Sequence, residues 1–156
     1  VIPFFLSEKE KGTLPITDKG MTRFMIKLEE GVELIWQAFE DMRGGEIYIK
    51  KIPSMGIMDI AKSVSANASF KEIGIRPGEK LHEQMIGLED AEYTYEYSDY
   101  YKILPSINKW SEDIKRIGDG KKVKADFSYC SNTNTEWMSV EELQHWIASN
   151  YNEVDF

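Results

Sequence analysis

Residues 28–50 read LEEGVELIWQAFEDMRGGEIYIK and contain the two periodicities on which the fold prediction rests. The first fifteen have an apolar residue every three or four positions, which predicts an amphipathic helix over 28–42. Gly44 and Gly45 end this helix, and the alternating segment 46–50 predicts a strand. A helix followed closely by a strand is typical of α/β proteins. The apolar set of the helix is Leu28, Val32, Ile35, Trp36, Phe39 and Met42.

The flanking sequence extends this alternation, so we expect an α/β fold, or α+β for the chain as an isolated piece. Pro15 lacks an amide hydrogen and places its segment at a sheet edge. Ser54 is a candidate N-cap, and Ser139 with Glu142 forms a capping box. The expected elements are helices over 1–11 (ending at Gly12), 57–64 and 139–150, a helical turn over 79–85, extended segments 13–17, 22–27, 70–75, 93–104 and 126–129, a turn at 18–20 and a mobile loop at 118–122.

The composition argues against several classes of protein. The 156 residues include 19 Lys and Arg but 27 Asp and Glu, a net charge of −8. Nucleic-acid binding needs a basic stripe, so we expect no nucleic-acid partner. The single cysteine, Cys130, allows no intrachain disulfide or cysteine-based zinc site and suits a reducing cytoplasm. The apolar runs are too short for a membrane span, and we see no signal peptide. Because the chain begins at Val1 in an apolar segment, we expect it to be trimmed or part of a longer protein.

Two short clusters each place an arginine beside a turn. Residues 20–24 contain Arg23, and residues 74–83 contain Arg76 followed by Pro-Gly and Lys80. A guanidinium can hold a phosphate through two parallel hydrogen bonds, and Lys80 adds a second cation to its cluster. The alternative is that each arginine simply pairs with a surface glutamate.

The remaining polar residues indicate no catalytic group in this chain. His82 could act as a general acid or base, although a hydrogen-bonded structural histidine is the commoner case. It does not belong to a His-Glu-x-x-His zinc motif because residue 86 is Ile, so no metal site is expected. His145 and Cys130 suit packing roles. The sequence has no Gly-x-Gly-x-x-Gly loop and no Tyr with a Lys four positions later, so we expect neither a dinucleotide site nor a short-chain dehydrogenase catalytic pair.

Several segments, in order, resemble the C-terminal half of the inverting UDP-N-acetylglucosamine 4,6-dehydratases, which begin pseudaminic acid synthesis and belong to the extended short-chain dehydrogenase/reductase superfamily. The tail, from Lys122 through Trp137 to residues 139–143, resembles the C-terminal extension of that group. The resemblance implies a UDP-sugar-binding part over 1–105 and a family-specific extension over 106–156. The matching segments are VIPFF (1–5), LPITD (14–18), MTRF (21–24), GGEI (44–47), KIPSM (51–55) and GIRPGEKLHE (74–83).

The resemblance also implies a missing N-terminal Rossmann half, which would carry the NADP site and the catalytic Tyr/Lys pair. The whole enzyme would be a cytoplasmic lyase, expected as a homo-oligomer, acting on UDP-N-acetylglucosamine. The apolar faces of 1–6, 28–42 and 57–64 would meet the missing half. By resemblance, Arg23 and Arg76 contact the diphosphate, the backbone of Leu14, Pro15 and Ile16 lies along the uracil, and the 51–55 loop with Ser54 lies near the sugar and diphosphate.

Two alternatives remain open. A nucleotide-sugar 4-epimerase or a retaining dehydratase would share both arginines. A non-catalytic sugar-nucleotide-binding module, working with a separate Rossmann chain, would also fit these residues.

Overall fold

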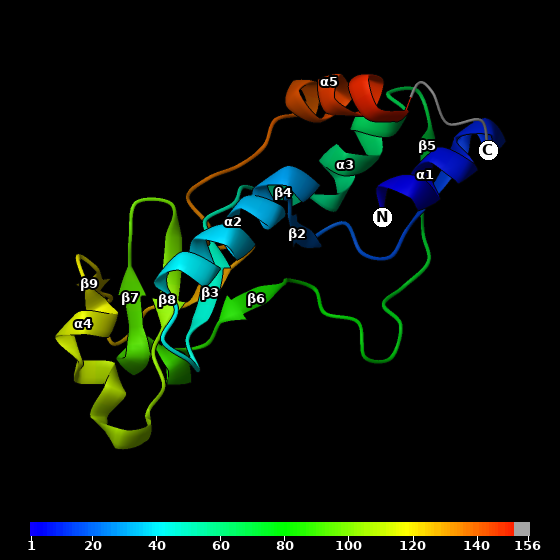
Figure 1. The fold of residues 1–156 in the computed structure, drawn as a ribbon. Coiled ribbons are helices and arrows are strands. Elements are labelled where there is room, and N and C mark those ends of the chain that lie inside the picture. The colour runs from blue at the N-terminus through cyan, green and yellow to red at the C-terminus, as the bar shows by residue number, and fades with distance from the viewer. Residues whose placement is uncertain (152–156) are drawn as a thin grey trace. The chain divides into compact units, whose positions relative to one another are not determined.

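The computed structural model describes residues 1–151 and divides the chain into two compact units, each assembled from segments far apart in sequence. Unit 1 comprises Val1–Met25, Pro53–Glu83 and the described residues from Ser131 to Tyr151, and unit 2 comprises Ile26–Ile52 and Gln84–Cys130. Both units mix helices with small sheets (Figure 1), which confirms the expected fold class. The family-level boundary expected after residue 105 lies within unit 2 and stays a prediction.

Within residues 1–151, unit 1 contains four helical elements and two small sheets. Strand β1 pairs in parallel with β5, and β2 pairs antiparallel with β4. Gly12, with φ of +69°, ends the first helical segment as expected. The elements are α1 (Ile2–Glu8), η1 (Lys9–Lys11), β1 (Thr13–Ile16), β2 (Thr22–Phe24), β4 (Ser54–Gly56), α3 (Ile57–Val64), β5 (Ser69–Glu72) and α5 (Val140–Tyr151).

The core of unit 1 forms around the apolar face of α3. Ile60 and Ala61 are buried there with Phe5 of α1 and Leu143 of α5. The α5 helix opens with the expected capping box, since Glu142 N donates to Ser139 Oγ and Ser139 N donates to the Glu142 carboxylate. The α3 face is therefore covered within this chain, and the expectation that it meets a missing partner is wrong.

Two details of unit 1 concern residues singled out in the sequence. Pro15 lies in β1, which pairs with β5 alone among the described residues, so its predicted edge position is confirmed. The predicted N-cap at Ser54 is wrong: Ser54 belongs to β4, and Gly56 caps α3 without a side-chain hydrogen bond. The strand continues to Gly56 because β4 pairs with β2.

Unit 2 is built on an antiparallel sheet with the strand order β3-β8-β7-β9. Predictions for two segments of unit 2 fail, and the extended segment expected over 126–129 is a strand only at Tyr129. Residues 84–86 form a strand that pairs with Tyr129 and Cys130 instead of extending a helical turn, and Lys121–Lys122 pair with β7 instead of lying in a mobile loop. The elements are α2 (Leu28–Asp41), β3 (Ile47–Lys50), β6 (Gln84–Ile86), η2 (Leu88–Tyr93), β7 (Thr94–Glu96), β8 (Tyr100–Ile103), η3 (Ile107–Glu112), α4 (Ile114–Ile117), β9 (Lys121–Lys122) and β10 (Tyr129–Cys130).

The helix α2 forms as predicted, but its apolar face remains exposed. Leu28, Trp36 and Phe39 are 79%, 66% and 61% exposed. The rings of Trp36 and Phe39 lie 6.2 Å apart on this surface. Large apolar side chains gathered on one exposed face indicate a surface that is covered in a larger assembly. At about 25 cal/mol per Å², a few hundred Å² of such surface favours association strongly.

We therefore expect the isolated 156-residue chain to self-associate through α2. Replacing Trp36 and Phe39 together by serine should lower the associated fraction without unfolding unit 2, because both side chains are mostly exposed. Sedimentation velocity over a range of concentrations measures this. Glu33→Ser, an exposed polar change on the same helix, is the matched control. A wild-type chain that stays monomeric at every concentration would contradict the prediction.

Unit 2 also buries a lysine. Lys102 is 2% exposed, and its Nζ donates to Asp41 Oδ2 at 2.6 Å. The same ammonium lies 4.8 Å from the ring centroid of Tyr97. Burial alone raises the pKa of Asp41, but hydrogen bonds from Lys102 and Tyr48 and the nearby cations outweigh it, so the pKa is lowered. Burial and the bonded Asp41 carboxylate raise the pKa of Tyr48, and burial raises that of Tyr100 to about 12.

The two partners of this ion pair should respond unequally to substitution. Asp41→Asn leaves the buried Lys102 ammonium without its counter-charge and should cost roughly 3 kcal/mol in free energy of unfolding. Lys102→Met removes the buried charge, leaves the partly exposed Asp41 to water, and should cost much less. Urea denaturation compares the three proteins. Equal losses for the two variants would contradict the asymmetry.

The pH dependence of stability follows from the lowered pKa of Asp41. The contribution of the ion pair is complete above the unfolded-state pKa, about 3.9. It is lost as the pH falls through the lower folded-state value. Asp41→Asn should remove this component of the acid sensitivity. The free energy of unfolding is measured at pH 7 and below pH 4 for the wild type, Asp41→Asn and Asp99→Asn. Comparing the loss at low pH among the three proteins tests whether this part of the acid sensitivity comes from Asp41.

Candidate functional site

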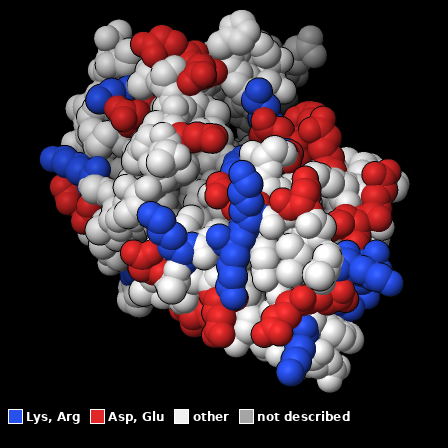
Figure 2. Space-filling model, turned by 90° about the vertical axis from the view of Figure 1, so that its left-hand side faces the viewer, with Lys and Arg blue, Asp and Glu red and all other residues white. Residues whose placement is uncertain are grey.

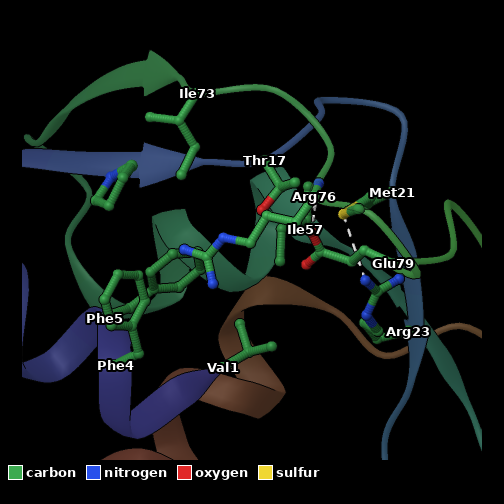
Figure 3. Close-up of a pocket in the computed structure, with 11 residues that line it drawn as sticks. Val1, Phe4, Phe5, Thr17, Met21, Arg23, Ile57, Ile73, Arg76 and Glu79 are labelled. Atoms are coloured by element: carbon green, nitrogen blue, oxygen red, sulfur yellow. Dashed lines mark hydrogen bonds between the residues drawn. The ribbon is translucent and has the colours of Figure 1, made fainter.

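A pocket of about 230 Å³ lies in unit 1 (Figure 3). Its walls come from α1, the end of β1, the start of β2, the first residue of α3 and the segment that follows β5. Apolar side chains form most of the lining, and two arginines and one glutamate supply its charge. The lining residues are Val1, Phe4, Phe5, Pro15, Thr17, Met21, Arg23, Ile57, Ile73, Arg76 and Glu79.

Arg23 is held firmly in β2. Its Nη1 donates to the carbonyl oxygens of Thr22 at 2.8 Å and Leu81 at 3.2 Å, and its Nη2 contacts Met21 Sδ at 3.3 Å. Its Nε lies 3.4 Å from Glu83 Oε1, and the side chain is 16% exposed. A guanidinium anchored in this way presents a fixed cation at the pocket wall at low entropic cost on binding.

Arg76 reaches the same pocket from the segment after β5. The chain turns sharply behind it, where Gly78 has φ of +82°, a conformation that favours glycine. The Arg76 amide donates to Glu79 Oε2 at 3.2 Å. Figure 3 shows the Arg76 side chain extending across the pocket toward Phe4 and Phe5. The structure therefore brings together the two arginines that the sequence singled out from separate clusters.

Glu79 gives the pocket a mixed polar character. Its carboxylate lies on the wall between the segments that carry Arg23 and Arg76 (Figure 3). An anion with no hydroxyl groups gains nothing from this carboxylate, whereas a ligand that carries both phosphates and hydroxyls can use all three side chains, since a carboxylate accepts hydrogen bonds from hydroxyls.

The other predicted site residues lie in different environments. Pro15 lines the pocket, while the side chains of Leu14 and Ile16 point into the core, which leaves only their backbone for a ligand. Lys80 is exposed and lies outside the lining. Ser54 is fully buried, and its Oγ accepts from Asn134 Nδ2 at 3.0 Å. Contacts of Leu14, Ile16, Lys80 and Ser54 with a ligand stay predictions.

Sequence reasoning missed part of the lining. Phe4 and Phe5 were expected to meet the missing half, and Glu79 received no role despite lying in the second arginine cluster. Its position three residues after Arg76, across a Pro-Gly turn, was the available signal. His82 does not line the pocket; its Nδ1 lies 2.9 Å from Thr22 Oγ1.

Comparison with known proteins finds sugar-nucleotide enzymes among the relatives of this chain. A family model described as "Polysaccharide biosynthesis protein" matches residues 1–105. Two proteins named UDP-N-acetylglucosamine 4,6-dehydratase (inverting), from Campylobacter jejuni strains NCTC 11168 and 81-176, are 51% and 49% identical over 150 residues. A UDP-glucose 4-epimerase from Rickettsia canadensis is 32% identical over 152 residues.

A solved structure shows the same fold. The X-ray structure of Pen from Bacillus thuringiensis matches with a TM-score of 0.79 and 28% identity, over 96% of this chain and 45% of that one. The Campylobacter alignments cover 92% of this chain and 45% of each relative, so the chain spans less than half the length of these relatives. None of the helices in the described residues is long and apolar enough to cross a membrane. The resemblance to inverting UDP-N-acetylglucosamine 4,6-dehydratases is confirmed, and the chain belongs to the polysaccharide biosynthesis protein family.

Proposed function

We propose that this chain is the UDP-sugar-binding portion of an inverting UDP-N-acetylglucosamine 4,6-dehydratase. The observation that carries the proposal is the convergence of Arg23 and Arg76 on one pocket in unit 1. The 51% identity to the Campylobacter dehydratase favours this substrate over that of the 4-epimerases, which are 32% identical or less. Both classes of relative carry a UDP-sugar in their names, which supports the nucleotide part of the ligand.

The pocket suits the diphosphate end of such a ligand. Its volume of about 230 Å³ lies below the about 300–1,000 Å³ of sites that enclose drug-sized molecules. The diphosphate would lie between the two guanidiniums, where charge-assisted hydrogen bonds form. Glu79 would accept a hydrogen bond from a ribose hydroxyl. The uracil would extend along the backbone of β1 near Pro15, and the sugar would lie outside this pocket.

We expect the dinucleotide site to lie outside the residues of this chain. The sequence has neither the glycine-rich loop that holds a pyrophosphate nor a Tyr with a Lys four positions later. NADP would therefore be bound by a part of the enzyme outside this chain. The role left to these residues is to bind and orient the nucleotide, which lowers a reaction barrier through positioning.

The exposed face of α2 supports a role within a larger protein. The relatives are more than twice as long as the match, and we propose that the part they have beyond this chain covers Trp36 and Phe39. That part would carry the NADP site and the catalytic groups. Assembly of the complete cytoplasmic lyase into a homo-oligomer belongs to the same proposal.

Arginine substitutions test the pocket directly. Arg23→Ala and Arg76→Ala should each remove charge-assisted hydrogen bonds worth roughly 1.5–3 kcal/mol, which is about a 10- to 150-fold loss of UDP affinity. Arg76→Lys should restore only part of the loss, because an ammonium cannot make the two-pronged contact. Arg23→Lys should also restore only part, because an ammonium cannot keep the anchors at the Thr22 and Leu81 carbonyls while it faces the ligand. Calorimetric titration with UDP measures these affinities.

Arg43 provides the matched control for that titration. It belongs to unit 2 and does not line the pocket, so Arg43→Ala should leave UDP affinity unchanged. Circular dichroism and thermal melting of each variant separate lost contacts from lost folding. Equal UDP affinities for the wild type and both pocket variants would remove the main support for the proposal.

The isolated chain should not convert UDP-N-acetylglucosamine. It should bind UDP but lack the groups that begin the oxidation of the sugar. Incubation with UDP-N-acetylglucosamine and NADP, followed by chromatography of the nucleotide sugars, should show only starting material. Robust turnover by the pure 156-residue chain would refute this division of function.

A further inference from the structure

Three segments of unit 1 meet behind Arg23 through a network of hydroxyl groups. Thr22 Oγ1 lies 2.6 Å from Ser131 Oγ and 2.9 Å from His82 Nδ1. Ser131 is fully buried, Thr22 is 8% exposed and His82 is half-buried. Strand β2 therefore meets the loop before β6 and the segment after β10 at one buried polar point, which the proposed function leaves without a role.

The Ser131 hydroxyl forms hydrogen bonds with the backbone of two residues, Thr22 and Glu83, that both contact the Arg23 side chain. Its Oγ donates to the Thr22 carbonyl at 3.2 Å and accepts from the Glu83 amide at 2.9 Å. The same Thr22 carbonyl accepts from Arg23 Nη1, and the Glu83 carboxylate lies beside Arg23 Nε. Two of the groups that fix the guanidinium are thus fixed in turn by one hydroxyl.

Counting hydrogens gives the arrangement in which all of these contacts are hydrogen bonds. A hydroxyl carries a single hydrogen, so a Ser131 hydroxyl that donates to the Thr22 carbonyl has none for Thr22 Oγ1. The Thr22 hydroxyl then donates to Ser131 Oγ, so Thr22 Oγ1 is an acceptor toward His82 Nδ1. Every contact is satisfied when neutral His82 carries its hydrogen on Nδ1, which leaves Nε2 without one.

We propose that Thr22, Ser131 and His82 are positioning residues that hold the Arg23 guanidinium in its anion-binding orientation. None of the three lines the pocket, so they act through Arg23. The inference rests on the proposed function, because a UDP diphosphate is the anion that Arg23 would bind. It also gives the segment after β10 a role in ligand affinity, although no residue of that segment lines the pocket.

A pair of substitutions at Thr22 separates the hydroxyl from the shape of the side chain. Thr22→Val keeps the branched shape that suits a strand but removes the hydroxyl, whereas Thr22→Ser keeps the hydroxyl. Loss of one neutral hydrogen-bond connection should weaken UDP binding about two- to tenfold in Thr22→Val. Thr22→Ser should retain the wild-type affinity. Ser131→Ala should weaken binding to a similar extent.

A double-mutant cycle tests whether the network acts through Arg23. In an Arg23→Ala background, Thr22→Val and Ser131→Ala should cause less than a twofold further loss of UDP affinity, since the group they position is gone. A full additional loss in that background would overturn the proposal and assign the residues a general structural role. Unchanged affinity in both single variants would overturn it as well.

The tautomer of His82 provides a readout that needs no ligand. Long-range ¹H–¹⁵N correlation spectra of the 156-residue chain, which has only two histidines, should show His82 protonated on Nδ1 at neutral charge. Finding the hydrogen on Nε2 would overturn the network even if Thr22→Val fails to fold. If wild-type protein shows the Nδ1–H tautomer but no UDP binding, the proposed function fails, and this role in anion binding fails with it.

Discussion

Burial of the apolar face of α3 is the interaction on which the candidate site depends. Ile60 and Ala61 in this helix are covered by α1 and β1, from the first sixteen residues, and by α5, more than seventy residues further along the chain than α3. Ile57, at the start of the same helix, and Phe5 of α1 are at once core residues and pocket lining. Truncating a buried residue such as Ile60 costs about 2–5 kcal/mol, a large share of the about 5–15 kcal/mol of a typical domain. Because the pocket shares these residues with the core, a substitution that changes its apolar wall is expected to lower the stability of unit 1 as well.

Local periodicity predicted the helices of this chain better than it predicted what covers them. Segments 28–42 and 57–64 show the same kind of amphipathic pattern, and both form helices as expected. Their apolar faces differ in outcome because α5 and α1 pack on α3, while Trp36 on α2 stays exposed. The failed prediction at 79–85 has a related cause: β6 forms by pairing with β10, more than forty residues away. The partners that decide these outcomes, such as α5 for α3 and β10 for β6, lie far away in the sequence, so a short window of sequence does not contain them.

The candidate site was predictable where residue chemistry is distinctive and missed where it is ordinary. Arg23 and Arg76 stood out because arginine is rare here and each lies beside a turn. Phe5 was missed as a lining residue because an aromatic side chain in an apolar run predicts packing, which it also provides. Ser131 carries no signal at all, since a serine becomes informative only when the fold buries it against Thr22.

The net charge of −8 has different consequences at different distances. On the face shown in Figure 2, acidic side chains lie among the basic ones. The proposed diphosphate would span only the pocket, where Arg23 and Arg76 would act at contact distance. At physiological ionic strength the screening length is about 8 Å, which weakens the repulsion from remote carboxylates more than the attraction of adjacent guanidiniums. An acidic chain could therefore still bind the small anion proposed here at two arginines, of which Arg23 is held by the Thr22 and Leu81 carbonyls and by the Glu83 carboxylate.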